Sequence, residues 1–330
     1  MTKRIPLRFA GTGAYVPQEV LTNQHFIDYL DTSDEWIVTR TGIRERRRAT
    51  KGETTATMSA KAAERALESA GMSACDIDLI VLATATGDCQ FPSTATFVQD
   101  LLGCQGTPAF DVGAACAGFL HALTVGGAFI ASGVHKTVLV IGAETLTRFI
   151  NAEDRTTAIL MGDGAGAAVI TRTSDPDQGI LHSTMGADGS KAKLIWVPAG
   201  GSLLPTSATT VAERLHFMHM RGREVYKFAV TKMQQLIDEC FERTGLTPED
   251  LKLVIPHQSN LRIIESVRER LGLPRDKVAI NIDRFGNTSA ASIPMALDEA
   301  RREGKLQTGD AILMLAIGAG LTWSAMIVRL

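Results

Sequence analysis

The chain has 330 residues, of which 45% are hydrophobic and 21% are charged, so it is long enough for one large soluble domain or for two. Lysine and arginine number 34 against 36 aspartates and glutamates, and the net charge of −2 gives no global attraction to nucleic acid or to an anionic membrane. The five cysteines have neither CxxC spacing nor a Cys/His pattern, which argues against a disulfide framework or a zinc site and favours a reducing compartment.

The N-terminal residues 1–6 lead directly into a strand-like segment without the apolar core of a signal peptide, and we find no apolar run of 18 residues further on. We therefore expect a cytoplasmic protein without a membrane span. Residues 11–16 are one glycine short of the GxGxxG fingerprint, and no acidic residue follows a clear strand–helix crossover at the required distance. Binding of a nicotinamide cofactor is accordingly disfavoured.

Residues 40–48 hold five arginines in nine positions. A solvated face is the simplest interpretation of such a run, and a nucleic-acid surface lacks support because no aromatic residues are interleaved. Further on, buried-strand patterns at 79–83 and 137–141 flank an apolar helical stretch, which is the alternation typical of an α/β fold. A strand ending at residue 170 precedes a polar loop, and there we place the boundary between two halves, residues 1–175 and 176–330.

The two halves resemble each other in sequence. Residues 66–81 and 242–255 both read as a helix closed by a glycine, a short turn with an aspartate and a buried strand, and the closing glycines lie 174 positions apart. The strand at 138–142 likewise matches 312–316. We predict a duplicated α/β unit whose halves pack about a pseudo-twofold axis.

A third match joins two turns of small residues. Residues 110–133 pair with 280–304 at an offset of 171, which sets Cys116 opposite Asn287. His257 directly follows the buried strand of the second repeat, and strand carboxyl ends are where α/β sheets gather ligand groups. The duplication therefore predicts that a cysteine, a histidine and an asparagine meet at one place.

Cys116 lies in the run DVGAACAGF, where a strand gives way to a helix. Small neighbours would let a substrate reach the sulfur, and the free N–H groups and positive dipole of the helix start would favour the nucleophilic thiolate. The alternative is a cysteine that only fills the core, because free cysteine is among the most buried residue types.

Short segments spread over the whole chain follow one order. They are residues 11–17, 33–37, 40–46, the run around Cys116, 162–167, 256–258, 286–290 and 318–323. In this order they resemble the β-ketoacyl-acyl carrier protein synthase III family of bacterial fatty-acid synthesis, within the thiolase superfamily. The resemblance implies an α/β, thiolase-like fold with duplicated βαβαβαββ halves in five layers, α-β-α-β-α.

The family's reaction is a decarboxylative Claisen condensation of an acyl-CoA, most often acetyl-CoA, with malonyl-acyl carrier protein to give 3-oxoacyl-acyl carrier protein. By resemblance, Cys116 carries the acyl group as an acyl-enzyme. His257 and Asn287 then donate hydrogen bonds to the enolate oxygen that forms when carbon dioxide leaves, as neutral groups that do not repel the malonyl carboxylate. The CoA thioester is a substrate, and no metal or redox cofactor is implied.

The resemblance also assigns binding residues. Backbone N–H groups of Cys116 and Ala319 would hold the thioester oxyanion, although the family usually has glycine at position 319, and a φ above zero would strain an alanine there. Phe91 would reach across a homodimer interface into the partner's acyl pocket, and Met161, which stands where several members have an aromatic residue, would line this pocket. The residues that would bind CoA or the carrier protein are Trp36, Arg40, Arg155, Arg223, Asn260 and Arg262.

Two alternatives stay open at this point. A relative recruited to secondary metabolism would use another acyl donor or acceptor, and a degenerate relative would bind a ligand without catalysis, which the complete Cys116/His257/Asn287 set argues against. Thiolase activity is disfavoured because the second catalytic cysteine it needs is missing, as Cys240 falls inside a predicted helix. The glycine run 162–166 lacks the Lys-Ser/Thr of a phosphate loop and is expected to permit close packing.

Overall fold

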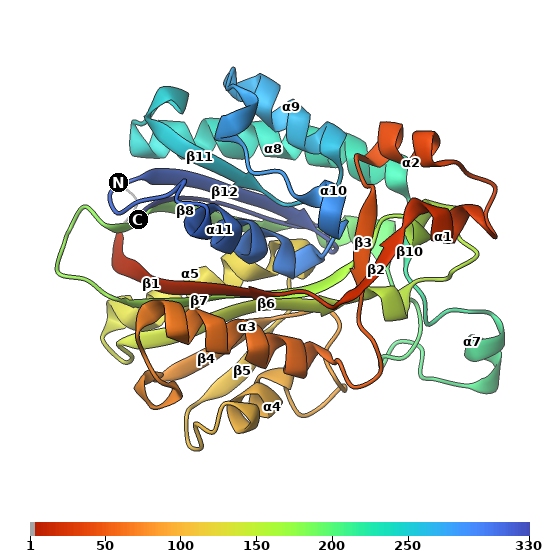
Figure 1. Cartoon of the computed structure of the whole chain (residues 1–330), viewed down its shortest axis with the longest axis horizontal. Coiled ribbons are helices and arrows are strands. Elements are labelled where there is room, and N and C mark those ends of the chain that lie inside the picture. The colour runs from red at the N-terminus through yellow and green to blue at the C-terminus, as the bar shows by residue number, and fades with distance from the viewer. Residues whose placement is uncertain (1–3) are drawn as a thin grey trace.

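The computed structural model describes residues 4–330. Its main feature is a nine-stranded sheet in the order β11-β12-β13-β8-β1-β7-β6-β4-β5 (Figure 1). The elements of the N-terminal half are β1 (Ile5–Tyr15), β2 (Glu19–Thr22), α1 (Asn23–Ile27), α2 (Asp34–Thr41), β3 (Glu45–Arg48), α3 (Thr55–Ala70), β4 (Leu79–Ala83), α4 (Thr94–Leu101), β5 (Ala109–Val112), α5 (Gly118–Ser132), β6 (Thr137–Thr145), α6 (Arg155–Ala158) and β7 (Asp163–Arg172).

The C-terminal half begins after the loop that follows β7. Its elements are β8 (Gly179–Ala187), β9 (Ile195–Trp196), α7 (Ala208–Ala212), β10 (His219–Met220), α8 (Gly222–Thr244), β11 (Leu251–Pro256), α9 (Leu261–Leu271), α10 (Ile282–Phe285), α11 (Ser292–Arg302), β12 (Ala311–Gly318) and β13 (Thr322–Arg329). Short pairing of β1 with β8, at Ile5↔Ile180 and Pro6↔Gly179, joins the strands of the two halves into one sheet.

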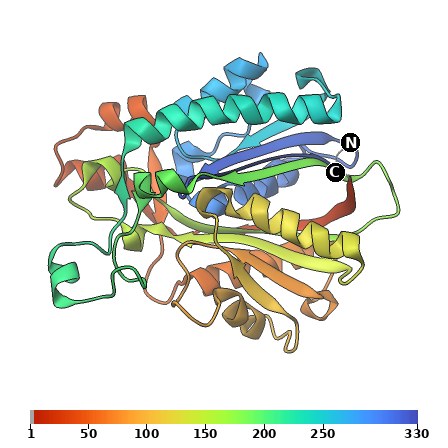
Figure 2. The same cartoon turned by 180° about the vertical axis from the view of Figure 1, so that it is seen from behind.

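The elements stack in five layers. Helices α8 and α9 cover the outer face of β11, β12, β13 and β8, helices α5 and α11 lie between the two groups of strands, and α3 and α4 cover the far face of the other group (Figures 1 and 2). Side chains of β4 alternate accordingly: Val81 packs in the middle layer with α5 and α11, whereas Ile80 and Leu82 pack against α3. Because both faces are covered, this strand is apolar throughout, and the predicted α-β-α-β-α arrangement is confirmed.

The repeat predicted from the sequence is present in the elements. Helices α3 and α8 both end at a glycine in the left-handed region, Gly71 with φ 64° and Gly245 with φ 73°. In each half a single 3-10 turn, with a capping box of Ser or Thr and Asp, then leads into the next parallel strand. The first residues of β6 and β12 are 174 positions apart, which is also the separation of Gly71 and Gly245.

The register that set Cys116 opposite Asn287 was wrong. The turns that precede α5 and α11 are the 3-10 segments Ala115–Ala117 and Ser289–Ala291, and they share an unusual positive φ, 45° at Ala115 and 47° at Ser289. These residues are 174 positions apart, so the counterpart of Cys116 is Ala290. The offset of 171 arose because α11 has 11 residues and α5 has 15, and matching the helix ends shifted the turns.

One expectation about membranes also needs correction. Residues Ala115–Ser132 are apolar and long enough to count as a candidate span by composition. Half of this window is buried, and α5 lies in the middle layer with strands on either side (Figure 2). Its apolar character therefore fits a core helix that packs between two groups of strands.

Candidate active site

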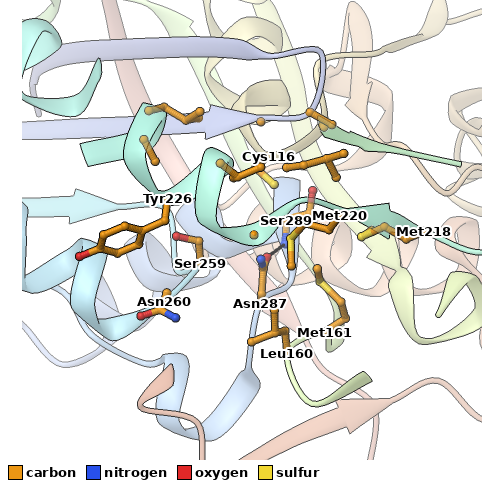
Figure 3. Close-up of a pocket in the computed structure, with 18 of the residues that line it drawn as sticks. Cys116, Leu160, Met161, Met218, Met220, Tyr226, Ser259, Asn260, Asn287 and Ser289 are labelled. Carbon is orange, nitrogen blue, oxygen red and sulfur yellow. Dashed lines mark hydrogen bonds between the residues drawn. The ribbon is translucent and has the colours of Figure 1, made fainter. Parts of the chain in front are cut away.

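Cys116, His257 and Asn287 line one cavity of about 640 Å³, together with Met161 and Ser289. Figure 3 shows Cys116, Asn287 and Ser289 close together, with Met161 and Met218 at one side of the cavity and Asn260 at the other. The cysteine comes from the turn before α5, the asparagine from the turn before α11, and the histidine from the end of β11. The predicted set thus meets in space, although the register that first suggested the meeting was three residues off.

Glycines let the turns approach one another. A Cβ on Gly142 of β6 would overlap the carbonyl of Ala290, and a Cβ on Gly162 would overlap the carbonyl of Phe285. A Cβ on Gly166 would lie 2.7 Å from the backbone nitrogen of Met295. The glycine run 162–166 therefore permits close packing, as expected from the sequence.

The Cys116 thiol is only partly exposed, and its surroundings oppose ionisation. Burial raises the pKa of Cys116 to about 12, and the negative charge of Glu144 acts in the same direction. Hydrogen bonding with the Ser289 hydroxyl and with the backbone N–H of Cys116 lowers this pKa, but these interactions do not outweigh burial. The expectation that the helix start stabilises a thiolate is therefore wrong for the resting protein, because loss of hydration dominates at this position.

His257 is held by a strand partner on one side and a hydroxyl on the other. Its backbone N–H donates to the carbonyl of Leu315 at 2.8 Å, and its Nδ1 lies 2.7 Å from Ser292 Oγ. The side chain is 2% exposed, and burial lowers the pKa of His257 to about 3. The imidazole is therefore neutral at physiological pH.

Asn287 is fixed through its backbone and its side chain. Its N–H donates to the carbonyl of Leu160 at 2.8 Å, and its own carbonyl accepts from the Gly162 N–H at 3.0 Å. The Ser289 N–H donates to Asn287 Oδ1 at 2.9 Å. With Oδ1 engaged, the amide presents the hydrogens of Nδ2 to a ligand.

The Gly318-Ala319 turn lies against the Cys116 turn. A Cβ on Gly318 would be 2.8 Å from the backbone nitrogen of Cys116 and 2.7 Å from the carbonyl oxygen of Ala114. The Thr322 hydroxyl, which lies 2.9 Å from the Ala114 carbonyl and 3.1 Å from that of Ala319, ties the two turns together. In the described chain Ala319 is not among the non-glycine residues with positive φ, so alanine is unstrained there, and its N–H and that of Cys116 belong to adjacent turns.

The mouth of the cavity is basic and carries an aromatic stack. The guanidinium carbons of Arg40 and Arg155 each lie 4.7 Å from the ring centroid of Trp36. Trp36 and Arg40 line the cavity, as do Arg223 and Arg262, whereas Arg155 contacts it only through Trp36.

Asn260 has a structural role in addition to the predicted one. Its side chain caps α9 by accepting from the Arg262 N–H at 2.9 Å, and its amide donates to the carbonyl of Arg40 at 3.0 Å. It therefore fastens α9 to α2 at the mouth of the cavity.

Phe91 and Met161 lie in different surroundings. Met161 is buried in the cavity wall and pairs with Asn287 through an isolated β-bridge. Phe91 is 84% exposed and lies outside this cavity in the single chain.

Sequence reasoning missed Glu144 and the serines around the cavity. Glu144 lies near the end of β6, fully buried, and accepts hydrogen bonds from Thr86 Oγ1 at 2.6 Å and from Ser289 Oγ at 3.1 Å. The available signal was a single charged residue near the end of an otherwise uncharged, continuously buried strand, because an ionisable group at a strand's carboxyl end is rarely there for packing alone.

Comparisons with known proteins agree over the full length. A family model described as 3-oxoacyl-[acyl-carrier-protein (ACP)] synthase III matches residues 110–189, and the model of its C-terminal part matches 241–330. The β-ketoacyl-[acyl-carrier-protein] synthase III of Caldanaerobacter subterraneus subsp. tengcongensis is 50% identical over 329 residues, which cover 100% of this chain and 99% of that relative.

Solved structures give the same result. The 3-oxoacyl-[acyl-carrier-protein] synthase III of Aquifex aeolicus superposes with a TM-score of 0.90 at 48% identity, covering 98% of this chain and 100% of that chain. The priming β-ketosynthase of the R1128 polyketide pathway has a TM-score of 0.90 at 36% identity and covers 100% of this chain and 98% of its own. The chain therefore belongs to the β-ketoacyl-acyl carrier protein synthase III family of acyltransferases, the condensing enzymes that initiate fatty-acid synthesis.

Proposed function

We propose that this protein joins the acyl group of an acyl-CoA, acetyl-CoA in the first place, to malonyl-acyl carrier protein through an acyl-enzyme on Cys116. The observation that carries this proposal is the meeting of Cys116, His257 and Asn287 at one cavity, with all three neutral near pH 7. A thiol that can accept an acyl group and two neutral donors beside it are the groups that the two half-reactions need.

In the first half-reaction, Cys116 Sγ attacks the thioester carbonyl carbon and CoA leaves. The carbonyl oxygen becomes an oxyanion, and we assign its hydrogen-bond donors to the N–H groups of Cys116 and Ala319; the adjacency of their two turns supports this assignment. Backbone N–H groups suit this task because the fold fixes their positions before the reaction begins. They are also neutral, so they need no counter-ion that the substrate would have to displace.

In the second half-reaction, the malonyl group loses carbon dioxide and leaves an enolate on its thioester oxygen. Donation from Asn287 Nδ2 and His257 Nε2 stabilises that oxygen, and loss of one such donor typically raises the barrier by about 3–4 kcal/mol. Neutrality matters here, because a carboxylate in either place would repel both the malonyl group and the enolate.

Ser292 sets which nitrogen of His257 carries the proton. Its Oγ is 2.7 Å from His257 Nδ1 and 2.9 Å from the carbonyl of Ser289, and its single proton serves one of these acceptors at a time. When Ser292 donates to Nδ1, Nε2 carries the imidazole proton and is a donor. The proposed reaction requires this tautomer.

The mouth of the cavity suits the carriers of both acyl groups. We assign the CoA adenine to the stack of Trp36, Arg40 and Arg155, and the CoA phosphates or the acidic carrier protein to Arg223 and Arg262 near Asn260. The chemistry calls for no metal or redox cofactor, because the thiol and the neutral donors supply each step.

We also propose a cytoplasmic homodimer. Phe91, which is 84% exposed in one chain, would be covered by the partner and would complete the partner's acyl pocket beside Met161. Sedimentation of the wild type and of a Phe91→Ala variant tests the assembly, with a dimer expected for the wild type.

Intact mass spectrometry tests the acyl-enzyme. The protein is incubated with a panel of acyl-CoAs, and the wild type should gain the mass of one acyl group that Cys116→Ser does not gain as a thioester. Addition of malonyl-acyl carrier protein should then remove the acyl mass and release 3-oxoacyl product. A wild type that gains no acyl group from any member of the panel would refute an enzymatic role for Cys116.

A second function has its own support. The priming β-ketosynthase of a polyketide pathway is as similar in structure as the fatty-acid enzyme of Aquifex aeolicus, and Met161 leaves an adaptable side chain in the acyl pocket. An enzyme of secondary metabolism would accept acyl-CoAs longer or more branched than acetyl-CoA, or would be acylated without turnover on malonyl-acyl carrier protein. The same panel separates the two functions.

A further inference from the structure

Glu144 is a buried carboxyl group that the proposed reaction has not used. It has no exposed surface, and Thr86 Oγ1 and the Ala85 N–H donate to it at 2.6 Å and 3.1 Å. Ser289 Oγ donates at 3.1 Å to the other oxygen. Among residues 4–330 its partners are neutral donors, with no lysine or arginine paired to it. A lone buried carboxylate is costly, so its retention beside the nucleophile calls for a reason.

Ser289 connects this carboxylate to the nucleophile. Its hydroxyl contacts the Cys116 sulfur as well as Glu144 Oε1, and Figure 3 shows Ser289 directly beside Cys116. The positive φ of 47° at Ser289 is unusual for a non-glycine residue and brings the residue into this position. The Ser289 hydroxyl therefore lies between the two groups: it donates to the Glu144 carboxylate and lines the same cavity as the Cys116 sulfur, whose pKa it lowers.

The other candidate for taking the thiol proton is His257. Burial lowers the pKa of His257 to about 3, which makes it a weak base, and Ser292 engages its Nδ1. The helix start alone does not ionise the thiol either, because burial holds the pKa of Cys116 at about 12. Acylation near neutral pH thus needs a different acceptor for the thiol proton.

We propose that Glu144, acting through the Ser289 hydroxyl, takes up the Cys116 proton during acylation and returns it after condensation. This inference rests on the proposed acyl-enzyme. As Sγ bonds to the thioester carbon, its proton passes to Ser289 Oγ and the serine proton passes to Glu144 Oε1, while CoA leaves as a thiolate and is protonated by solvent. When the enolate displaces the sulfur, the protons move back along the same path, so the reaction consumes one solvent proton in total.

The charges in the site support this order of proton transfers. Burial raises the pKa of Glu144 to about 7, against the lowering by its hydrogen-bond donors, and a base poised near the working pH is the most effective kind. The resting proton stays on sulfur and transfers as the carbon–sulfur bond forms. In the acyl-enzyme Glu144 is protonated and neutral, so the malonyl carboxylate enters a cavity from which one negative charge has been removed.

The test is the pH dependence of acylation by acetyl-CoA, followed by rapid quench and intact mass over pH 5.5–9. In the wild type the rate should rise as pH increases through about 7, because Glu144 must be ionised to accept the proton. Glu144→Gln and Ser289→Ala should each slow acylation by roughly 10²–10⁴-fold. In both variants the acylation rate should no longer increase with pH near 7. The double variant should be no slower than either single variant, since both changes break one path.

Thr86→Val is the matched control. Thr86 donates to Glu144 and has no contact with the sulfur in the described structure, so the variant should keep the rise but move its midpoint to higher pH, because a donor that lowers the pKa of Glu144 is gone. A purely structural role for Glu144 would instead slow Thr86→Val and Glu144→Gln alike without moving the midpoint.

The outcomes separate the relay from the proposed function. A Glu144→Gln variant that is acylated at the wild-type rate with the wild-type midpoint overturns the relay alone, whereas a wild type that no acyl-CoA acylates overturns the acyl-enzyme itself. Thermal melting checks folding of each variant. If Glu144→Gln does not fold, Ser289→Ala decides, because it keeps a Cβ at the same backbone position, and survival of the rise in that variant contradicts the proposal.

Discussion

The turns before α5 and α11 have the same backbone and opposite chemistry. Both are 3-10 segments that lead into a central helix, with φ near 45° at residues 174 positions apart, Ala115 and Ser289. In the proposed reaction the N-terminal turn carries the nucleophile Cys116. The C-terminal turn carries Ser289, which would relay the thiol proton, and is preceded by Asn287, which would act on the malonyl group. The two turns therefore share one backbone frame, and under the proposal a few different side chains divide the reaction between the halves.

The largest effect should follow removal of the thiol. Cys116→Ala should abolish the acyl-enzyme and reduce turnover on the order of 10⁴-fold or more. A double variant, Cys116→Ala with Ala290→Cys, places a thiol at the matching position of the other turn and should stay inactive, because Ala290 is 1% exposed and packs on Gly142. Mass spectrometry with acetyl-CoA measures both.

Cys75→Ala, at an exposed cysteine, is the control and should be acylated as the wild type is. Recovery of acylation in the double variant would mean that the two turns are interchangeable, against the division proposed above.

The second prediction concerns the donors. His257→Ala and Asn287→Ala should slow release of carbon dioxide from malonyl-acyl carrier protein by about 10²–10³-fold and change acylation far less, because each donates to the enolate oxygen and not to the acyl thioester. Asn287→Asp should be worse than Asn287→Ala, since a carboxylate repels the malonyl group. Equal loss in the two half-reactions would contradict the assignment.

The third prediction concerns the contact between the halves. Gly142→Ala should reduce the free energy of unfolding by about 1–3 kcal/mol, because the new Cβ overlaps the Ala290 carbonyl and forces the C-terminal turn away. Gly189→Ala, where a Cβ meets nothing within 4 Å, is the control and should change stability by about 0.5 kcal/mol or less. Denaturant titration measures the free energy of unfolding of both variants. If Gly142→Ala were as stable as Gly189→Ala, the fold would tolerate moving the C-terminal turn away from β6.

The smallest effect is expected at Ser292. Ser292→Ala removes the hydroxyl beside His257 Nδ1, and the lost hydrogen bond, worth about 1 kcal/mol, should slow decarboxylation roughly fivefold and leave acylation unchanged. Single-turnover kinetics of each half-reaction provide the readout. Loss of acylation instead would indicate that Ser292 serves the Cys116 turn and not the histidine.

Much of this site could be predicted from the sequence. Cys116, His257 and Asn287 stand next to strand ends and small-residue turns, whose local sequence patterns are strong, and the order of segments pointed to the family. The repeat was visible because Gly71 and Gly245 each end a helix in the left-handed backbone conformation. Residues with a Cβ rarely adopt this conformation, so glycine marks such positions in the sequence.

The features of the site that could not be predicted depend on contacts between residues far apart in the sequence. The protonation of Cys116 is decided by desolvation and by Glu144, and neither is local in sequence. Glu144 itself lies next to Ser289 only because β6 and the turn before α11, which are far apart in the sequence, come together in the fold. The register between Cys116 and Ala290 needed the backbone angles, since α5 and α11 differ in length.

The central claim is that the N-terminal turn holds the acyl group while the C-terminal turn acts on it. Peptide mapping by mass spectrometry after incubation with acetyl-CoA, followed by a chase with malonyl-acyl carrier protein, tests it most directly. The acyl group should appear on the peptide that contains Cys116 and should leave it at the rate at which carbon dioxide and 3-oxoacyl product form. Product formation with an unmodified Cys116 peptide, or an acyl group on another cysteine that turns over at that rate, would contradict the account.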